Sequence, residues 1–469
     1  MENVMKTPLS AVALSLTFTL GTHLALAAPS PTDRVYTADQ NTNTVSVINP
    51  ASNTLLGQIR LGNQRPDILS PLYKGEINVH GLGFSPDHKT LIAISNGSNS
   101  VAFIDTATNK VKGITYVGRS PHEGFFSADG KEVWVVVRGE NYISVIDPTT
   151  FKETRRIETA AGPGMVLFHP NGKLAFVVHS FTAEVDVIDV ATHKVIKRIP
   201  VVSPFSPFLQ FTPNAKELWM THKDVGKVTR IDLESLEVKS VFDTGFITNH
   251  IGFAKTAQGT RAYVTLGGDN LVKVYSMDDT PKLLTSITVG ALPHGIWPSD
   301  DGTRMYVGLE NGDAVDVIDT ANDQVIARVP AGQAPQALVY VSNAVSTGDG
   351  TANLVARVND EPLNVALKAS TGDGKGFVVA RNLGVVDSLE VSLFKLKPQT
   401  LYSLYMSGQD RPLASFKTNP AGAANSTVIG PLRTVISAQS KQPATAATLM
   451  IMEGEGAMNS SKVVLSSGR

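Results

Sequence analysis

Histidines recur in this chain at a nearly constant spacing, and imidazole is a side chain that can do chemistry. Four of them begin similar segments, in which a glycine and an aromatic residue follow within a few positions. Three further copies of the segment begin with other residues. The seven starting positions are His80, His122, Gly164, Pro207, His250, His294 and Gln336. Steps of about 42 residues indicate a structural repeat, so the histidines should occupy equivalent places in it.

A second set of polar residues follows about 16 positions after each start. Asn96, Arg138 and Glu310 stand at this offset, and His179 and His222 stand within one residue of it. Six of the nine histidines beyond residue 27 thus fall in repeat-equivalent places: His80, His122, His179, His222, His250 and His294. The other three are expected at turns or strand edges on the surface. They are His88, His169 and His193.

Six such imidazoles would line a polar pocket, and imidazole suits Zn, Cu, Fe and Ni. It also serves as an acid or base near neutral pH. Arg138 suits a carboxylate or phosphate, and Glu123 and Glu310 suit a base or a partner of a metal-bound histidine. The sequence therefore predicts the six histidines as metal ligands, with Arg138, Glu310 and Glu123 contacting a cofactor. The ion, Cu, Zn or Fe, or a metallocofactor, stays open, and so does the alternative that these histidines only bond to one another and to water.

Each repeat contains four strand-like runs. The first ends in a polar turn, the second is rich in β-branched residues, and the third alternates apolar and polar residues, as in 185–189. Four antiparallel strands at this period form one blade of a β-propeller. The last first-strand run, 337–341, lacks following partners, and residues 34–60 contain the missing three. We expect an all-β fold with a seven-bladed propeller over 28–345, closed by the N-terminal strands.

The runs around Tyr36-Thr37-Ala38-Asp39 and Tyr263-Val264-Thr265 resemble the YVTN-type propeller repeat, and the resemblance extends over about residues 34–345. The resemblance implies a seven-bladed propeller that is often exported. It implies no single activity, because propellers host binding proteins, lyases, lactonases and redox enzymes.

The histidine-lined propeller is also similar to the catalytic domain of nitrous oxide reductases, which holds a copper–sulfide cluster. Three of the seven first-strand positions are not histidine here, and the chain has no cysteine for an electron-entry copper site. Propellers that carry haem d1 through an axial histidine, and streptogramin lyases, are similar at the level of the fold.

The remaining chain suggests a second domain. Residues 346–353 are rich in Gly, Ser, Thr and Asp and predict a linker. Alternating runs after it predict a small β-sandwich-like domain over 354–469, with a partly mobile segment at 421–448. This domain is a candidate docking module for a protein partner.

The N-terminus and the composition bear on location and partners. Residues 1–27 contain a short apolar run and end in Ala-Leu-Ala, so they predict a signal peptide and an exported protein, periplasmic or secreted. No other stretch is long enough to span a membrane. The net charge of −1 gives no basic footprint, so no nucleic-acid partner is expected. Cysteine is absent, which excludes disulfides and thiolate chemistry.

These observations favour an exported propeller that binds a ligand or metal at a histidine-rich pocket at the mouth of its channel. Two alternatives stay open. The first is a metal-dependent enzyme, a lyase or oxidoreductase, that uses the same pocket. The second is a protein-interaction scaffold without a small-molecule site.

Overall fold

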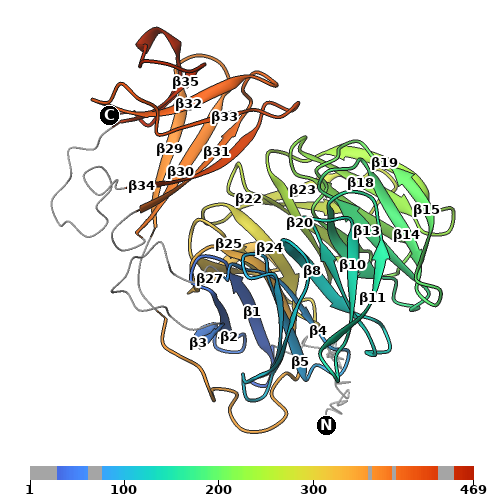
Figure 1. The fold of residues 1–469 in the computed structure, drawn as a ribbon. Coiled ribbons are helices and arrows are strands. Elements are labelled where there is room, and N and C mark those ends of the chain that lie inside the picture. The colour runs from blue at the N-terminus through green and yellow to red at the C-terminus, as the bar shows by residue number, and fades with distance from the viewer. Residues whose placement is uncertain (1–28, 62–76, 358–361, 383–386, 431–447, 469) are drawn as a thin grey trace, which may run out of the picture.

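The computed structural model describes residues 29–61, 77–357, 362–382, 387–430 and 448–468. Seven four-stranded antiparallel sheets form the blades of a propeller, and a separate eight-stranded sheet forms a C-terminal domain beside it (Figure 1). The innermost strands of successive blades contact one another in a closed cycle around the channel. The predicted all-β fold with a seven-bladed propeller and a small second β domain is confirmed.

The strands of the propeller follow the four runs of the repeat. The innermost strands are β4 (Val79–Phe84), β8 (Pro121–Phe126), β12 (Pro163–Phe168), β16 (Leu209–Phe211), β20 (Thr248–Thr256), β24 (Pro293–Pro298) and β28 (Pro335–Val341). The second strands are β5 (Thr90–Ser95), β9 (Val133–Val137), β13 (Leu174–His179), β17 (Glu217–His222), β21 (Gly259–Leu266), β25 (Arg304–Leu309) and β1 (Arg34–Asp39). The third strands are β6 (Ser100–Asp105), β10 (Tyr142–Asp147), β14 (Glu184–Asp189), β18 (Lys227–Asp232), β22 (Leu271–Ser276), β26 (Ala314–Asp319) and β2 (Thr44–Asn49). The outer strands are β7 (Val111–Tyr116), β11 (Lys152–Glu158), β15 (Lys194–Pro200), β19 (Glu237–Asp243), β23 (Leu283–Thr288), β27 (Gln324–Pro330) and β3 (Thr54–Arg60).

The N-terminal strands close the ring. The last blade has the order β28-β1-β2-β3, and β1 pairs antiparallel with β28 with Val35 opposite Tyr340. This pairing covers an inner-strand edge that would otherwise present unpaired backbone groups. The prediction that residues 34–60 complete the seventh blade is confirmed.

Local sequence explains the blade. Val185 and Val187 of β14 are fully buried between blades, as the alternation of apolar residues predicts. The turn after an inner strand is fixed by a short polar motif: Ser127 Oγ donates to Asp129, and the Glu132 amide donates to Ser127 Oγ. Such side-chain bonds satisfy backbone groups where the ladder ends.

The C-terminal domain consists of one continuous sheet. Its strands are β29 (Leu363–Ala369), β30 (Lys375–Asn382), β31 (Asp387–Phe394), β32 (Leu401–Met406), β33 (Ala414–Lys417), β34 (Ala424–Gly430), β35 (Leu449–Glu453) and β36 (Val463–Ser466), with one 3₁₀ turn, η2 (Ser460–Lys462). The order is β33-β32-β35-β36-β29-β30-β31-β34, and the edge strands β33 and β34 contact each other. The sheet therefore bends round almost into a barrel, with Val378, Leu389 and Ile451 in its core.

The predicted linker 346–353 is held against the propeller. Arg34 donates to the Asp349 carbonyl at 2.6 Å, and Asn109 donates to the Gly350 carbonyl at 2.9 Å. Val355 then pairs with Gln58 beside β3. The domain bounds themselves stay predictions.

Three further expectations concern segments at the margins of the described chain. The predicted signal peptide, 1–27, lies outside the described residues. Of the segment 421–448, residues 424–430 form β34, and 431–447 lie outside the described residues. In the part that is described, no helix has the length and apolar character to cross a membrane.

Candidate functional site

A β-bulge at the start of the inner strand positions the predicted site residues. The ladder register shifts between Val79 and Gly81, and between Pro121 and Gly124, so His80, His122 and Glu123 lie at bulges. The same shift occurs at Asn249–His250 and at His294–Gly295. A bulge inserts a residue and re-aims its side chain, and bulges favour barrel rims and active sites. The fold thus presents these side chains at one end of the channel.

A second ring of residues lies at the same end. Each donates its amide N–H to a carbonyl just before the inner strand, two residues before the inner-strand position in six blades and three residues before His250 in the other. This ring consists of Gln40, Asn96, Arg138, Ser180, Lys223, Gly267 and Glu310. Side-chain bonds between the two rings show that they share one rim: Gln40 contacts His80, and Glu310 contacts His294.

His80 and His122 form a contacting pair at this rim. Their Nε2 atoms lie 2.7 Å apart and their ring centroids 4.2 Å apart. His80 Nδ1 lies 2.8 Å from Gln40 Oε1, and His122 Nδ1 donates to the Gly164 carbonyl at 2.6 Å. Burial lowers the pKa of both imidazoles well below the usual value, and nearby Arg138 lowers it further. Both rings are therefore neutral near pH 7.

Glu123 completes a group of three potential metal ligands. One ligand atom each of His80, His122 and Glu123 lie within 4.8 Å of one another, and all three residues are buried. Burial raises the pKa of Glu123 well above the usual value, although the Leu82 amide and Arg138 favour its charged form. Gly81 leaves room for this carboxylate, since a Cβ at that position would lie 2.8 Å from Glu123 Oε2.

His250 and His294 form a second pair on the same rim. Their ring centroids lie 4.9 Å apart, and His250 stacks on Phe208 at 3.9 Å. His294 Nδ1 lies 2.8 Å from Glu310 Oε2. Burial alone would raise the pKa of Glu310, but the hydrogen bond from His294 and the charge of Lys223 lower it to about 2. Glu310 is therefore ionised, and its carboxylate orients the His294 ring.

The two histidine pairs are electrostatic neighbours. Burial lowers the pKa of His80 most, the charge of Arg138 lowers it next, and the charge of His294 lowers it further. His294 and His80 also act on His250. Four imidazoles, two carboxylates and the cations Arg138 and Lys223 therefore share one small region at the rim.

The structure does not bring His179 and His222 into this group. His179 is fully buried within its blade, where Nδ1 donates to the Glu184 carbonyl and Nε2 lies 3.4 Å from Asp186 Oδ2. His222 is fully buried between Ser206 Oγ at 2.7 Å and Thr229 Oγ1 at 2.6 Å. Each is the last residue of its second strand, one position before the rim ring. A one-residue offset in a strand turns the side chain to the other face.

Lys223 and Gln40 are rim residues with polar side chains that are absent from the predicted site. Lys223 stands 16 residues after Pro207, and Gln40 follows Asp39 at the end of β1. Reading the offset strictly would have selected Lys223 instead of His222. Gln40 lies in the blade that the N-terminal strands close, so no constant offset from Gln336 points to it.

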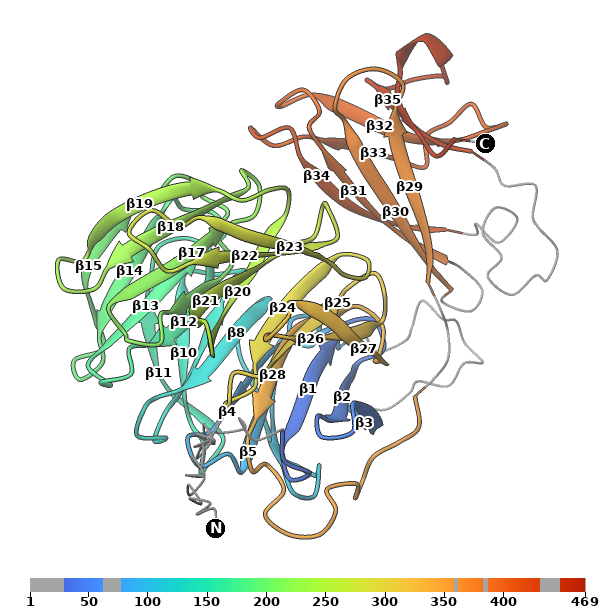
Figure 2. The same cartoon turned by 180° about the vertical axis from the view of Figure 1, so that it is seen from behind.

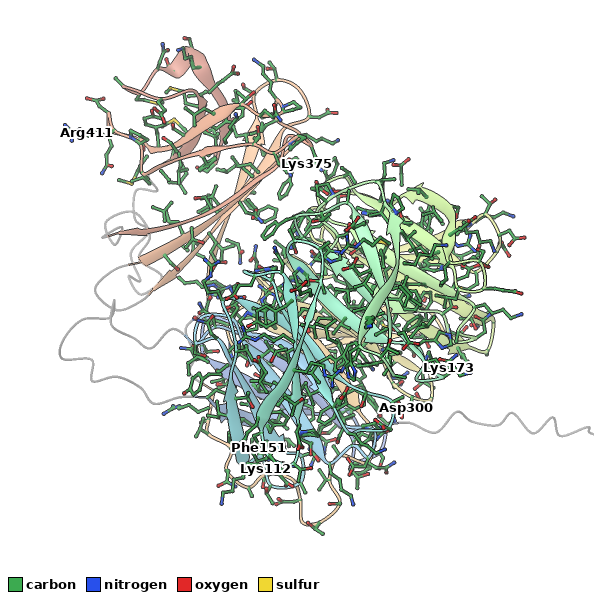
Figure 3. All side chains as sticks on the ribbon, turned by 45° about the vertical axis from the view of Figure 1, so that its right-hand side comes forward. Lys112, Phe151, Lys173, Asp300, Lys375 and Arg411 are labelled. Atoms are coloured by element: carbon green, nitrogen blue, oxygen red, sulfur yellow. The ribbon has the colours of Figure 1, made fainter. Side chains whose placement is uncertain are left out.

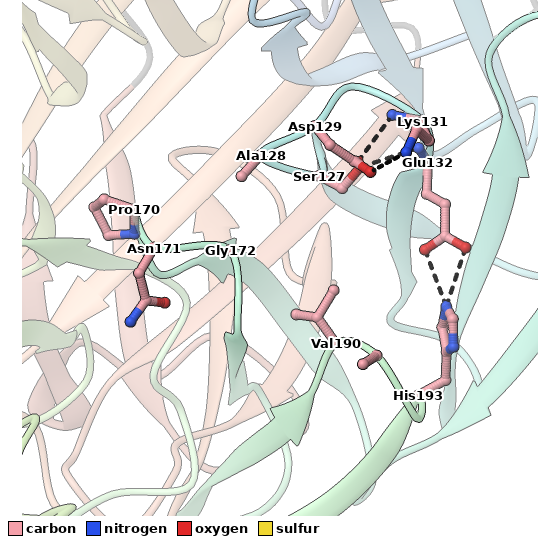
Figure 4. A pocket seen from close by; sticks show the side chains of 11 residues that line it. Ser127, Ala128, Asp129, Lys131, Glu132, Pro170, Asn171, Gly172, Val190 and His193 are labelled. Atoms are coloured by element: carbon pink, nitrogen blue, oxygen red, sulfur yellow. Dashed lines mark hydrogen bonds and ion pairs between the residues drawn. The ribbon is translucent and has the colours of Figure 1, made fainter.

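The other three histidines lie away from the channel, in turns. His88 contacts the Ser342 carbonyl at 2.6 Å, and His169 lies 3.3 Å from the Ala215 carbonyl. Figure 4 shows His193, whose Nε2 lies 3.0 Å from Glu132 in a hollow between the turns of two blades. Their bonds to turn residues fit a structural role.

The C-terminal domain packs against the rim that carries the histidines. Arg381 of β30 donates two 2.9 Å bonds to Asp313 and one 3.0 Å bond to the Glu310 carbonyl. Phe394 packs with Ile247 and Leu292, which precede inner strands. At the edge, Lys375 pairs with Asp269 at 3.2 Å, and Figure 3 shows Lys375 on the side that faces the propeller. The view from behind also shows this domain on one side of the ring (Figure 2).

Comparison with known proteins supports this architecture. Residues 119–331 match the YNCE-like beta-propeller family. The match spans β8 to β27, five of the seven blades. It confirms the resemblance to the YVTN-type repeat, which is close to this family. A search of curated proteins found no match.

Solved structures share the fold. Hydrazine synthase of Kuenenia stuttgartiensis has 21% identity and a TM-score of 0.52, covering 56% of this chain and 89% of that one. A functionally unknown protein from Desulfotomaculum acetoxidans DSM 771 has 13% identity and a TM-score of 0.56, covering 66% and 99%. Dihydro-heme d1 dehydrogenase NirN in complex with DHE has 13% identity, covering 86% of this chain and 76% of that one. Its TM-score of 0.49 falls below the level that indicates a shared fold. At these identities the likeness concerns the fold alone.

Proposed function

We propose that the protein binds one transition-metal ion at the channel mouth, with His80, His122 and Glu123 as its ligands. The observation that carries the proposal is the contact between the two Nε2 atoms at 2.7 Å. Two imidazole nitrogens at this distance need a cation or a proton between them, because two lone pairs repel.

The hydrogen bonds at Nδ1 support a cation between the rings. A carbonyl only accepts, so His122 Nδ1 carries the proton and His122 Nε2 presents a lone pair. Gln40 Oε1 likewise accepts from His80 Nδ1, which leaves a lone pair on His80 Nε2 as well. Fixing both Nδ1 protons in this way is how proteins orient histidines toward a metal.

Two arrangements without metal compete with this one. A proton shared between the rings would require an imidazolium, which burial disfavours here. Reversal of the Gln40 amide would let His80 Nε2 donate to His122 Nε2. If the Gln40 amide is reversed in this way, the protein should not bind added metal.

The donor set fits a transition metal. Two imidazoles and one carboxylate suit Zn, Cu or Fe, whereas Ca²⁺ and Mg²⁺ prefer oxygen ligands alone. Three protein ligands leave further coordination positions open, as in catalytic sites. Bound metal would supply Lewis acidity, and its binding would require the ionised form of Glu123.

Metal stoichiometry tests the proposal. The protein is dialysed against Zn²⁺, Cu²⁺ or anaerobic Fe²⁺, freed of excess ion, and analysed for metal. We expect about one equivalent of at least one ion in the wild type and a loss of at least tenfold in affinity in His122→Ala and Glu123→Gln. The matched control His169→Ala should keep wild-type binding. Wild-type protein that retains none of these ions would overturn the proposal and favour the scaffold alternative.

A metal-dependent enzyme is the second candidate. The favouring observation is the His294–Glu310 pair, which faces the same region and resembles an oriented acid or base. Export is a further proposal, supported by the signal-peptide pattern in residues 1–27. Cell fractionation tests it: recovery of the unprocessed chain only in the cytoplasm would refute export.

A further inference from the structure

We propose that the same rim binds a small oxyanion, a carboxylate or phosphate group, between Arg138 and Lys223. This site would give the proposed metal-binding rim a second class of ligand. Only the expected effect of bound metal on anion affinity rests on the proposed function. The anion site itself is carried by two cationic side chains and by an opening that leads to one of them.

The two cations are built into the rim at equivalent places. The Arg138 amide donates to the Ser120 carbonyl at 3.2 Å, and the Lys223 amide donates to the Phe205 carbonyl at 3.3 Å. These bonds fix both residues at the end of a second strand. Among the described residues, no hydrogen bond or ion pair engages the Arg138 guanidinium or the Lys223 ammonium. Both groups therefore have donors free for a ligand.

Charge at the rim favours an anion. The pKa of Arg138 falls only to about 10 through burial, opposed by Glu123, so Arg138 stays charged at neutral pH. Burial also lowers the pKa of Lys223, while Glu310 opposes this and Arg138 adds to it. The pKa of the Glu310 carboxylate is lowered, but His294 and Gln336 already bond to it, and Asp224, which lines the opening to Lys223, accepts a hydrogen bond from Ser203. Two like charges near each other repel, and an anion between them would offset that repulsion.

An opening between the two domains gives access to Lys223. A cavity of about 300 Å³ is lined by Lys223 and Ile247 of the propeller and by Phe394, Lys417 and Asn425 of the C-terminal domain. This volume lies at the lower end of the range for small-molecule sites. Lys417 and Asn425 add donors on the far wall. The size and the donors suit a metabolite-sized acid rather than a polymer.

A divalent ion at His80, His122 and Glu123 would raise the positive charge of the rim. Arg138 lies close enough to lower the pKa of both histidines, so it would also repel the metal. A bound oxyanion offsets that repulsion. Metal and anion should therefore strengthen each other's binding, and linkage requires the effect to be reciprocal.

Calorimetric titration with inorganic phosphate and with succinate tests the inference on metal-free and Zn²⁺-loaded protein. We expect saturable binding of at least one anion at one site per chain. Arg138→Gln and Lys223→Gln should each weaken it about tenfold or more, since a charged hydrogen bond contributes at least a tenfold effect. The matched controls Arg119→Gln and Lys216→Gln change exposed cations outside the rim and should bind as the wild type does. The two probes distinguish a phosphate site from a carboxylate site.

The outcomes separate this inference from the metal proposal. Anion binding that depends on Arg138 and Lys223 without any metal uptake supports the inference and refutes the metal site. Metal uptake without saturable binding of either anion refutes the inference and leaves the metal site. Binding that is equal in the wild type and both rim variants also refutes it. Because neither cation makes a described hydrogen bond or ion pair, both variants should fold as the wild type does, which a thermal melt verifies.

Discussion

Replacing Arg381 with methionine should loosen the C-terminal domain from the propeller. The Arg381 side chain is 0% exposed and its partner Asp313 is 1% exposed. Arg381 donates two bonds of 2.9 Å to this carboxylate and one of 3.0 Å to the Glu310 carbonyl. Removing one partner of a buried ion pair costs about 3–5 kcal/mol, because the other charge stays buried without compensation. We expect a loss of this size in the free energy that holds the two domains together.

The distribution of tryptophan makes this measurable. Trp134, Trp219 and Trp297 all lie in the propeller, so their fluorescence reports its unfolding alone. Far-UV circular dichroism reports both domains. In urea, the wild type should show coincident transitions by the two probes. In Arg381→Met the dichroism transition should begin at lower urea than the fluorescence transition.

A double-mutant cycle and a surface control complete the test. Arg381→Met together with Asp313→Leu should cost less than the sum of the single changes, because the double variant removes both charges of this pair. Lys375→Met removes an interdomain pair whose lysine is 54% exposed, so it should cost about 0–1 kcal/mol. If Arg381→Met costs no more than Lys375→Met, or if the two buried changes are simply additive, the reasoning is refuted.

Three further predictions concern the propeller. Burial raises the pKa of Asp39 to about 7, so the folded chain holds a proton there that the unfolded chain releases above about pH 4. Stability should fall between these pH values by up to about 1.4 kcal/mol per pH unit, and Asp39→Asn should lose this contribution in unfolding experiments at pH 5 and 7.5; an unchanged slope would contradict it. His222→Ala should cost about 1–3 kcal/mol, because the buried Thr229 hydroxyl loses its bond to the imidazole and Ser206 Oγ keeps only its bond to the Ser203 carbonyl, yet metal uptake should be unchanged; lost uptake in a folded variant would bring His222 back into the site. Gln40→Leu should weaken Zn²⁺ binding about tenfold or more while Gln40→Glu retains it, since only the carboxylate still accepts from His80 Nδ1; equal affinities in competition titrations would rule out this positioning role.

The repeat made the fold predictable. Its period identified the blades. The run at 337–341 has no following strands of its own, and residues 34–60 supply them, which identified how the propeller closes. The period also located His80, His122, His250 and His294, because equivalent residues of a propeller meet around its axis. These predictions needed only local patterns and their repetition.

The finer geometry of the site depended on single-residue register. His179 and His222 stand one residue before the rim ring, and that offset turns them into the blade. His250 lies one residue after the inner-strand position that Asn249 occupies, at the second residue of the bulge. A bulge has no reliable local sequence signature, so alignment alone could not separate these positions.

Docking of the second domain could not be predicted. Arg381 and Asp313 are 68 residues apart in sequence, and neither stands in a recognisable motif. Their pairing follows from the shapes of two folded surfaces. The role of Lys223 at an opening between the domains was hidden for the same reason.

The most direct test of the central claim is anomalous diffraction at the zinc edge from crystals grown with Zn²⁺. We predict a peak at the channel mouth, about 2.0–2.1 Å from Nε2 of His80 and of His122 and about 2.0–2.2 Å from a carboxylate oxygen of Glu123. The two Nε2 atoms would then move apart from their present 2.7 Å to accommodate the ion. Zinc found only at surface histidines such as His169, with the His80–His122 contact intact, would contradict the claim.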